Sequence, residues 1–444
     1  MSTHSQSGDR RSAPGFLGAW ERLVGPRGVP TLAARRGRKP RVPLTQVLPA
    51  LTFHVMQDAG TLAEHLFQLF RTPLADSSWS DRRARLPWEI FADLMRRALR
   101  PRATRQQQPE AFWRGWRVLA LDGTQFSVTN TPRITTTLGK ARTRRGPAAF
   151  AKIATTVLLE VGLHNPLAAA IGRHGEYEWD LAATVLAQLP KRAVVLGDRL
   201  YGCAPFAAQL AAACQRVGSH LLLRARLEIK PRVRQRLADG SRLIRVPVRA
   251  RRRRRHILHV LDLREIRVRV GRRGYRTSEL RLWTTLVDPR TAPAVELAQL
   301  YAQRWDHELY FRQLKRQLRK TALLQSHTVE TAAQEIAALV LASAVLAAER
   351  ARVAAGHVPV LRVSFSKILE LVKPMWLTVQ LGDGLLTNRQ LDQMLARAYA
   401  LMRQCVTPVR RARTCPRAVR QPVSRWPRLL QTESIEGPLH FQVV

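Results

Sequence analysis

The run Ala193-Val194-Val195-Leu196 constrains the fold of this chain more than any other part of the sequence. Its four residues are all apolar, without the polar alternation of a strand that has one face in water. Such runs are typical of strands that are buried on both faces, as in the sheet of an α/β protein. The run stops at Gly197-Asp198, which places an acidic side chain at the carboxyl end of the predicted strand.

The segments around this run predict the rest of a sheet and the helices that cover it. Apolar and β-branched stretches indicate strands at 116–121, 153–159, 167–172 and 220–224. The first of these strands is expected to end near Asp122-Gly123-Thr124. Amphipathic spacing indicates helices at 180–189 and 205–217.

The flanking regions have different patterns. From 44 to 100, apolar residues recur at intervals of three and four, which predicts a small helical region. From 225 to 285, short β-prone runs separated by Arg, Gly and Asp turns predict a β-rich insertion. A long helix from Ala294 to Lys320 and an apolar helix around 336–348 are expected after it.

We therefore predict an α/β chain in six segments. They are a disordered basic N-terminus (1–40), a helical DNA-binding region (41–110), the first part of a catalytic domain (111–224), a β-rich insertion (225–286), the second part of the catalytic domain (287–350), and a C-terminal helical region with a basic tail (351–444). Arg and Pro are frequent after 405, which favours loose order in the tail.

The charge of the chain indicates the class of its partner. Lys plus Arg number 74 against 32 for Asp plus Glu, a formal net charge of +42. Self-repulsion of this size costs stability unless a polyanion binds, so we expect a nucleic acid as partner. The stretch Arg35–Arg41 resembles a minor-groove arm, although a solvated basic linker has the same composition.

Cysteine usage and the longest apolar run bear on the compartment. The four cysteines, at 203, 214, 405 and 415, have no spacing typical of a zinc site or a disulfide framework. This favours free thiols in a reducing cytoplasm. The run from Ile336 to Ala348 is shorter than a bilayer span and predicts a buried helix, and the polar N-terminus has no signal-peptide pattern. We expect no membrane partner and no small-molecule cofactor.

Acidic residues at strand ends are the first candidates for chemistry. Asp122 and Asp198 each follow a predicted strand, and in open α/β sheets ligands gather at the carboxyl ends of strands. Carboxylates there can hold divalent metal ions, which bind a scissile phosphate, lower the pKa of the attacking water and stabilise the leaving oxygen. An aspartate that starts a turn or caps a helix has the same local sequence.

A third acid comes from the long helix predicted at 294–320. At about 100° per residue, Tyr301, Arg304, Glu308 and Lys315 fall within an arc of about 60°. Arg312 falls close to this arc, whereas Asp306 falls on the far side of the helix. One carboxylate therefore shares a helix face with several cations, as expected beside DNA phosphates.

Other interpretations of these residues stay open. Arg304 and Glu308 are four residues apart and would also form an ion pair on an exposed helix face. Trp305 either stacks an unpaired base, a contact worth roughly 1–3 kcal/mol, or packs in the core. Glu176 and Glu178 are the main alternatives to Glu308 as the third acid, although a first-turn role in the helix that follows them also explains both.

These residues resemble a known family. The pattern Tyr301-x2-Arg304-x3-Glu308-x6-Lys315 is similar to the Tyr-Arg-Glu-Lys signature of bacterial insertion-sequence transposases of the DDE class, the insertion sequence four family. Asp122-Gly123-Thr124 and Asp198-Arg199-Leu200-Tyr201 resemble the two aspartate motifs of that family. Leu200 stands where the family often has Gly. The resemblance covers roughly residues 40 to 350.

The resemblance implies a ribonuclease H-like catalytic domain that is interrupted by the β-rich insertion. It implies two Mg²⁺ ions, with Mn²⁺ as a substitute, held by Asp122, Asp198 and Glu308. It implies contacts with DNA from Tyr301, Arg304, Trp305, Arg312 and Lys315. A homodimer in the bacterial cytoplasm, at the nucleoid, would bind the terminal inverted repeats, free a 3′-hydroxyl at each end by hydrolysis and join it to target DNA.

Three other functions are compatible with parts of this pattern. A metal-dependent nuclease without strand transfer would use the same carboxylates. A non-catalytic DNA-binding protein derived from a transposase would have no need of three acids together with the helix signature. A basic structural protein predicts no such set of acids, and it fits the sequence least.

Overall fold

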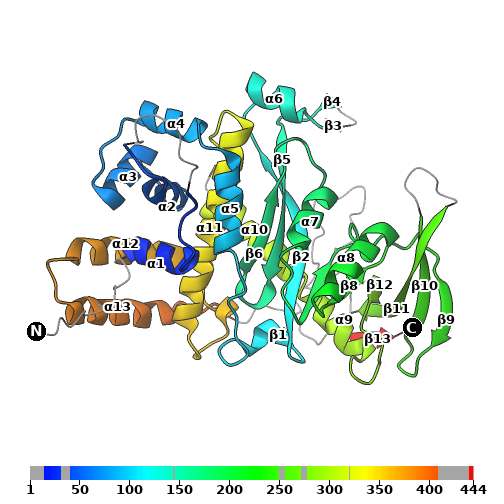
Figure 1. Ribbon diagram of the computed structural model, residues 1–444. Coiled ribbons are helices and arrows are strands. Elements are labelled where there is room, and N and C mark those ends of the chain that lie inside the picture. Colours follow the sequence, from blue (N-terminus) through cyan, green and yellow to red (C-terminus); the bar gives the residue numbers. More distant parts are fainter. Residues whose placement is uncertain are drawn as a thin grey trace, which may run out of the picture.

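The computed structural model describes residues 15–31, 41–143, 146–249, 256–271, 278–319, 321–408 and 440–443. A large mixed sheet runs through the molecule, and a layer of helices lies at one end of it (Figure 1). In the described residues its strands are β1 (Phe112–Trp113), β2 (Trp116–Ser127), β5 (Lys152–Glu160), β6 (Asn165–Ile171), β7 (Ala193–Gly197), β8 (His220–Arg224), β9 (Arg232–Arg236), β10 (Arg242–Arg249), β11 (Ile257–Gly271), β12 (Ser278–Thr284) and β13 (His440–Val443). The main path is β6-β5-β2-β7-β8-β12-β11-β10-β9, so the chain is the mixed α/β protein that was predicted.

The middle of the sheet combines parallel and antiparallel strands. β2, β7 and β8 are parallel, and β5 runs antiparallel to β2. All of β7 is buried, as its apolar run predicts. The prediction that β2 ends near Asp122 is wrong. Its pairing with β7 ends at Leu121↔Gly197, but its pairing with β5 continues to Ser127↔Lys152 and keeps the strand extended.

Helices cover both faces of this part of the sheet. Alternate residues of β2 point to opposite faces. Leu119 and Leu121 share a core with α7 (Glu178–Leu186) and α8 (Ala204–Arg216). Val118 and Ala120 share another core with α9 (Ala294–Ala302). The place where β2 and β7 stop pairing therefore lies between two helical layers.

The region predicted as a β-rich insertion consists of β9 to β12. Because β12 pairs with β8, these strands continue the central sheet. β13, near the end of the tail, pairs with β11 through Val268↔Val443, so the expectation of loose order is wrong for this strand. Residues 32–40, with most of the predicted basic arm, and the arginine-rich residues 250–255 lie outside the described residues.

A helical layer flanks the other edge of the sheet (Figure 1). It contains α1 (Gly15–Val24), α2 (Leu44–His54), α3 (Leu62–Phe70), α4 (Asp76–Ala84), α5 (Trp88–Ala98), α11 (Val329–Ala354), α12 (Phe365–Gly382) and α13 (Asn388–Arg403). The expectation of disorder through residue 40 is wrong for α1, because its apolar side chains are buried. Phe16 packs on Trp376 of α12 with ring centroids 5.3 Å apart. Shorter helices outside this layer are α6 (Pro132–Leu138), η1 (Pro109–Ala111), η2 (Val161–Leu163) and η4 (Val360–Arg362).

Helix α11 is the apolar helix that was predicted around 336–348, but it is longer, with 26 residues. Its length and composition would allow it to cross a membrane, yet 83% of its most apolar window is buried inside the protein. It packs between the N-terminal helices and β6, which is the position of a core helix. Cys203, Cys214 and Cys405 are free thiols, as expected, and Cys415 lies outside the described residues.

Candidate active site

Asp122 and Asp198 lie side by side because of the register between β2 and β7. The last parallel pair is Leu121↔Gly197, and each aspartate is the next residue of its chain segment. The Gly123 amide donates to Oδ1 of Asp122 at 2.9 Å, and the Leu200 amide donates to Oδ1 of Asp198 at 2.7 Å. The structure thus brings these two predicted acids together at one edge of the sheet.

Glu308 belongs to a helical segment that differs from the prediction. The single helix expected from Ala294 to Lys320 is divided into α9, α10 (Trp305–Arg312) and the π-helix η3 (Gln313–Leu318). Between α9 and α10, backbone amides bond carbonyls three residues earlier, as Arg304 does with Tyr301 at 3.0 Å. The prediction of one regular helix is wrong, and neither Pro nor Gly marks this turn in the sequence.

His307 fixes α10 against the sheet. Its side chain is fully buried, and its Nε2 lies 3.1 Å from the backbone oxygen of Val157 in β5. A carbonyl oxygen only accepts, so Nε2 carries the proton. Burial lowers the pKa of His307 to about 3, and the ring stays neutral. This anchor determines where the neighbouring residues Arg304 and Glu308 lie.

Arg304 connects Glu308 to the aspartates. Its Nη1 lies 3.7 Å from Oδ2 of Asp122, and its Nη2 donates to Oε1 of Glu308 at 2.9 Å. The Arg304–Glu308 ion pair that was considered from spacing is therefore present, but Arg304 also reaches an acid of the sheet. Among the described residues, no three His, Cys, Asp or Glu side chains come close enough to hold a metal ion together. Glu308 joins the aspartates through Arg304.

The acids at the sheet edge repel one another. The pKa of Asp122 is raised to about 7, chiefly by burial and then by the negative charge of Asp198, and Arg304 partly opposes this shift. Glu178, at the first position of α7, also raises the pKa of Asp122. Burial, followed by the charge of Asp198, raises the pKa of Glu178 itself. A divalent cation would stabilise the charged form of these carboxylates, and their oxygens are suitable ligands for such an ion.

Tyr301 lies near the acids, and Lys315 contacts β2 at Gln125, three residues after Asp122. Tyr301 is 6% exposed, and its hydroxyl has no hydrogen-bond partner in the part of the chain that the structure describes. Burial raises the pKa of Tyr301. The positive charge of Arg304 opposes this shift, and the negative charge of Asp198 adds to it. Lys315 donates to the carbonyl of Gln125, in β2, at 2.7 Å. Burial and the neighbouring cations lower the pKa of Lys315 to about 8.

Arg312 and Trp305, which were also predicted to contact DNA, have different surroundings. Arg312 lines a cavity of about 460 Å³ behind α10, together with Asp306, so the structure does not bring Arg312 to the acids. Trp305 is half-buried at the start of α10, and its Nε1 has no partner among the described residues.

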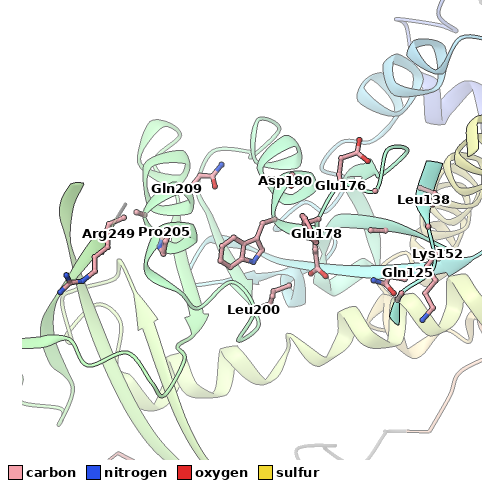
Figure 2. A pocket seen from close by; sticks show the side chains of 18 of the residues that line it. Gln125, Leu138, Lys152, Glu176, Glu178, Asp180, Leu200, Pro205, Gln209 and Arg249 are labelled. Atoms are coloured by element: carbon pink, nitrogen blue, oxygen red, sulfur yellow. The ribbon is translucent and has the colours of Figure 1, made fainter. Parts of the chain in front are cut away.

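A groove of about 1350 Å³ opens beside Glu178 (Figure 2). Its lining includes the cations Lys140 and Lys152 and the aromatic residues Phe150, Tyr177 and Trp179. Tyr177 is 78% exposed. Cations interleaved with aromatic side chains are typical of surfaces that bind single-stranded nucleic acid.

The profile of the transposase DDE domain family matches residues 113–345, which is more than half of the chain. The chain belongs to the DDE transposase family. The transposase InsG for insertion sequence element IS4 of Escherichia coli (strain K12) is 26% identical over 326 residues, which cover 72% of this chain and 71% of that protein. The predicted membership of the insertion sequence four family is therefore confirmed.

Two residues of this DDE transposase gained importance only from its structure. The sequence offered Glu178 as an alternative third acid. Its carboxyl group lies against Gly123, the residue after Asp122, and its charge raises the pKa of Asp122. Tyr201 was part of the second aspartate motif, and its hydroxyl donates to Oε1 of Glu178 at 2.6 Å. Both residues were near the predicted site in the sequence, but no pattern there predicts the contact between them.

The raised pKa of Asp122 predicts how the stability of the metal-free transposase depends on pH. A carboxyl group whose folded pKa lies above its unfolded value stabilises the fold fully below the unfolded pKa, and this contribution is lost as pH rises through the folded pKa. With a shift from 3.8 to about 7, the loss falls between pH 4 and 7. It should reach on the order of 2–4 kcal/mol relative to Asp122→Asn, which does not titrate. Parallel pH profiles of the unfolding free energy for the two proteins would contradict this prediction.

Proposed function

We propose that this transposase cleaves the ends of an insertion sequence and joins the 3′-hydroxyl ends to target DNA. In this proposal Asp122, Asp198 and Glu308 are the acids that hold the metal ions. One observation carries it: the strand register that sets Asp122 beside Asp198, with Arg304 joining Asp122 to Glu308. Divalent ions bound there would activate the attacking water or hydroxyl and stabilise the leaving oxygen.

We also propose that residues 111–224 and 287–350 form one ribonuclease H-like catalytic domain, interrupted by 225–286. A mixed sheet with helices on both faces, and acids directly after the last parallel pair of β2 and β7, support this assignment. DNA binding by the helical region 41–110 stays a prediction from the sequence pattern, and a homodimer that holds two ends stays a prediction from the family resemblance.

The other residues around the acids have roles in binding DNA. Arg304 and Lys315 carry the positive charge for phosphates, and the buried hydroxyl of Tyr301 is available as a donor. Trp305 stays the candidate for stacking a base. The groove beside Glu178 fits a single strand, with Lys140 and Lys152 for phosphates and exposed Tyr177 for a base. We leave Arg312 out of this set because it lines the cavity behind α10.

Replacing Lys315 by alanine should weaken the binding of end DNA. Loss of one phosphate contact should reduce the slope of log affinity against log salt by about 0.9. Lys191 is a matched control, because it is exposed before β7, at the opposite edge of the sheet from Asp198. Mobility-shift titrations at several salt concentrations measure both slopes. An unchanged slope for Lys315→Ala would place Lys315 away from phosphate.

A strand-joining assay tests the proposed activity. The substrate is a pre-cleaved transposon end with a free 3′-hydroxyl, incubated with a circular target DNA and Mg²⁺. We expect covalently joined products with the unmodified protein. Cleavage of an uncut end without any joining of the pre-cleaved end would instead indicate a nuclease of the same fold.

A further inference from the structure

Glu178 contacts the chain segments that carry both aspartates of the candidate site. Its Oε1 accepts the hydroxyl of Tyr201 at 2.6 Å, and Tyr201 is fully buried three residues after Asp198. On its other side the carboxyl group lies against Gly123, the residue after Asp122. A Cβ on Gly123 would stand 2.2 Å from Cδ of Glu178 and 2.5 Å from both of its oxygens. A single side chain thus bridges the β2 backbone next to Asp122 and the segment that follows Asp198.

We propose that Glu178 is a positioning residue, which holds the β2 backbone at Asp122 and the segment after Asp198 at the separation that metal binding requires. This inference rests on the proposed function, because it assumes that the two aspartates bind the metal. Glu178 acts through its contacts with Tyr201 and Gly123, and the metal is held by other acids. A carboxylate near two aspartates would only add repulsion if it had no partner. The buried hydroxyl of Tyr201 donates a hydrogen bond to Glu178 and holds its side chain in one position.

The geometry around Glu178 depends on the residues opposite it. Gly123 has no side chain, so the carboxyl group can lie directly against the backbone of β2. The ring of Tyr201 packs on Phe206 of α8, with centroids 4.8 Å apart, which fixes the position of its hydroxyl. Glu176, two residues earlier, points in the opposite direction (Figure 2) and bonds the amide of His174 at 2.7 Å. It therefore serves as a control acid from the same segment.

The test measures the binding of Mn²⁺ to the full chain without DNA, by calorimetry and by the electron paramagnetic resonance signal of free Mn²⁺. Substitution of groups that orient metal ligands typically lowers metal affinity about 10- to 100-fold. We expect a loss of this size for Glu178→Ala and for Tyr201→Phe, which removes only the hydroxyl. Glu178→Gln keeps an oxygen that accepts from Tyr201 and should lose less than about 10-fold. Glu176→Gln should bind Mn²⁺ like the unmodified protein.

A double substitution tests the contact with Gly123. Gly123→Ala should lower Mn²⁺ affinity as Glu178→Ala does, because its methyl group displaces the Glu178 carboxyl group. In the Glu178→Ala background the methyl group has room, so Gly123→Ala should cause no further loss. Full additivity of the two losses would overturn the proposed contact.

Other outcomes separate this inference from the proposed function. Unchanged Mn²⁺ affinity in both Glu178→Ala and Tyr201→Phe, with circular dichroism showing that both fold, would overturn the positioning role. A loss in Glu178→Gln as large as in Glu178→Ala would also overturn it, because the charge would then act directly on the metal. Unchanged affinity in Asp122→Asn and Asp198→Asn would instead reject the metal site of the proposed function.

Discussion

Replacing Asp122, Asp198 or Glu308 by alanine is expected to abolish metal-dependent cleavage of end DNA, with a fall in rate of at least about 1000-fold. Each substitution removes an acid that the proposal assigns to the metal ions. Asp122 and Asp198 follow the last parallel pair of β2 and β7, so the loss of either leaves only one of these two aspartates. Binding of end DNA should persist, because the cations around the acids remain. Cleavage rates and mobility shifts with the same labelled end measure the two effects.

Asp306→Ala is the matched control for Glu308→Ala. Both acids belong to α10, but Asp306 lines the cavity behind this helix. We expect the control to cleave at a rate close to that of the unmodified protein. Full cleavage by Glu308→Ala would remove Glu308 from the active site, and it would make Glu178 the remaining acid beside the aspartates.

Replacing Arg304 by alanine should lower the cleavage rate by about 100-fold or more, as expected when a preorganised charged donor is removed beside a reacting phosphate. Arg304 lies between Asp122 and Glu308 and lowers the pKa of Asp122. Without this cation the acids carry more uncompensated negative charge. Arg304→Ala should therefore bind Mn²⁺ at least as tightly as the unmodified protein, whereas Asp122→Asn should bind it more weakly.

The matched control for Arg304 is Arg312→Ala, a guanidinium of the same helix that lines the cavity behind it. Cleavage rates and Mn²⁺ affinities of the two variants separate an effect at the acids from a general loss of positive charge. Weaker Mn²⁺ binding in Arg304→Ala would mean that Arg304 supports the acids structurally, contrary to this prediction. A large loss of cleavage in Arg312→Ala alone would return Arg312 to the DNA-binding set.

The sequence predicted the strands that position the aspartates because their patterns are local. A continuous apolar run such as 193–196 is typical of a strand buried on both faces, and Gly197-Asp198 follows it directly. The end of β2 was not predictable in the same way. Its extension to Ser127 comes from pairing with β5, a partner about 30 residues away whose register no local pattern reveals.

The helix that carries Glu308 shows the limit of periodicity. The arithmetic of a regular helix placed Arg304 and Glu308 correctly on one face, since they are one turn apart and form an ion pair. It failed to predict where the regular helix begins and ends, because a turn precedes Trp305 and a π-helix follows Arg312. Lys315 still reaches the β2 backbone, whereas Arg312 does not lie with the acids. The contact between Glu178 and Tyr201 joins two elements and has no signature in either segment.

The central claim is that Asp122, Asp198 and Glu308 hold the same metal ions. A crystal structure of the full chain with Mn²⁺ and a pre-cleaved DNA end, with the metal located by anomalous scattering, tests it most directly. We expect Mn²⁺ bound by oxygens of Asp122 and Asp198, at about the 2.0–2.2 Å usual for small divalent ions, with Glu308 released from Arg304 to complete the site. Mn²⁺ held by Asp122, Asp198 and Glu178 while Glu308 stays paired with Arg304 would contradict the account, as would a site without metal.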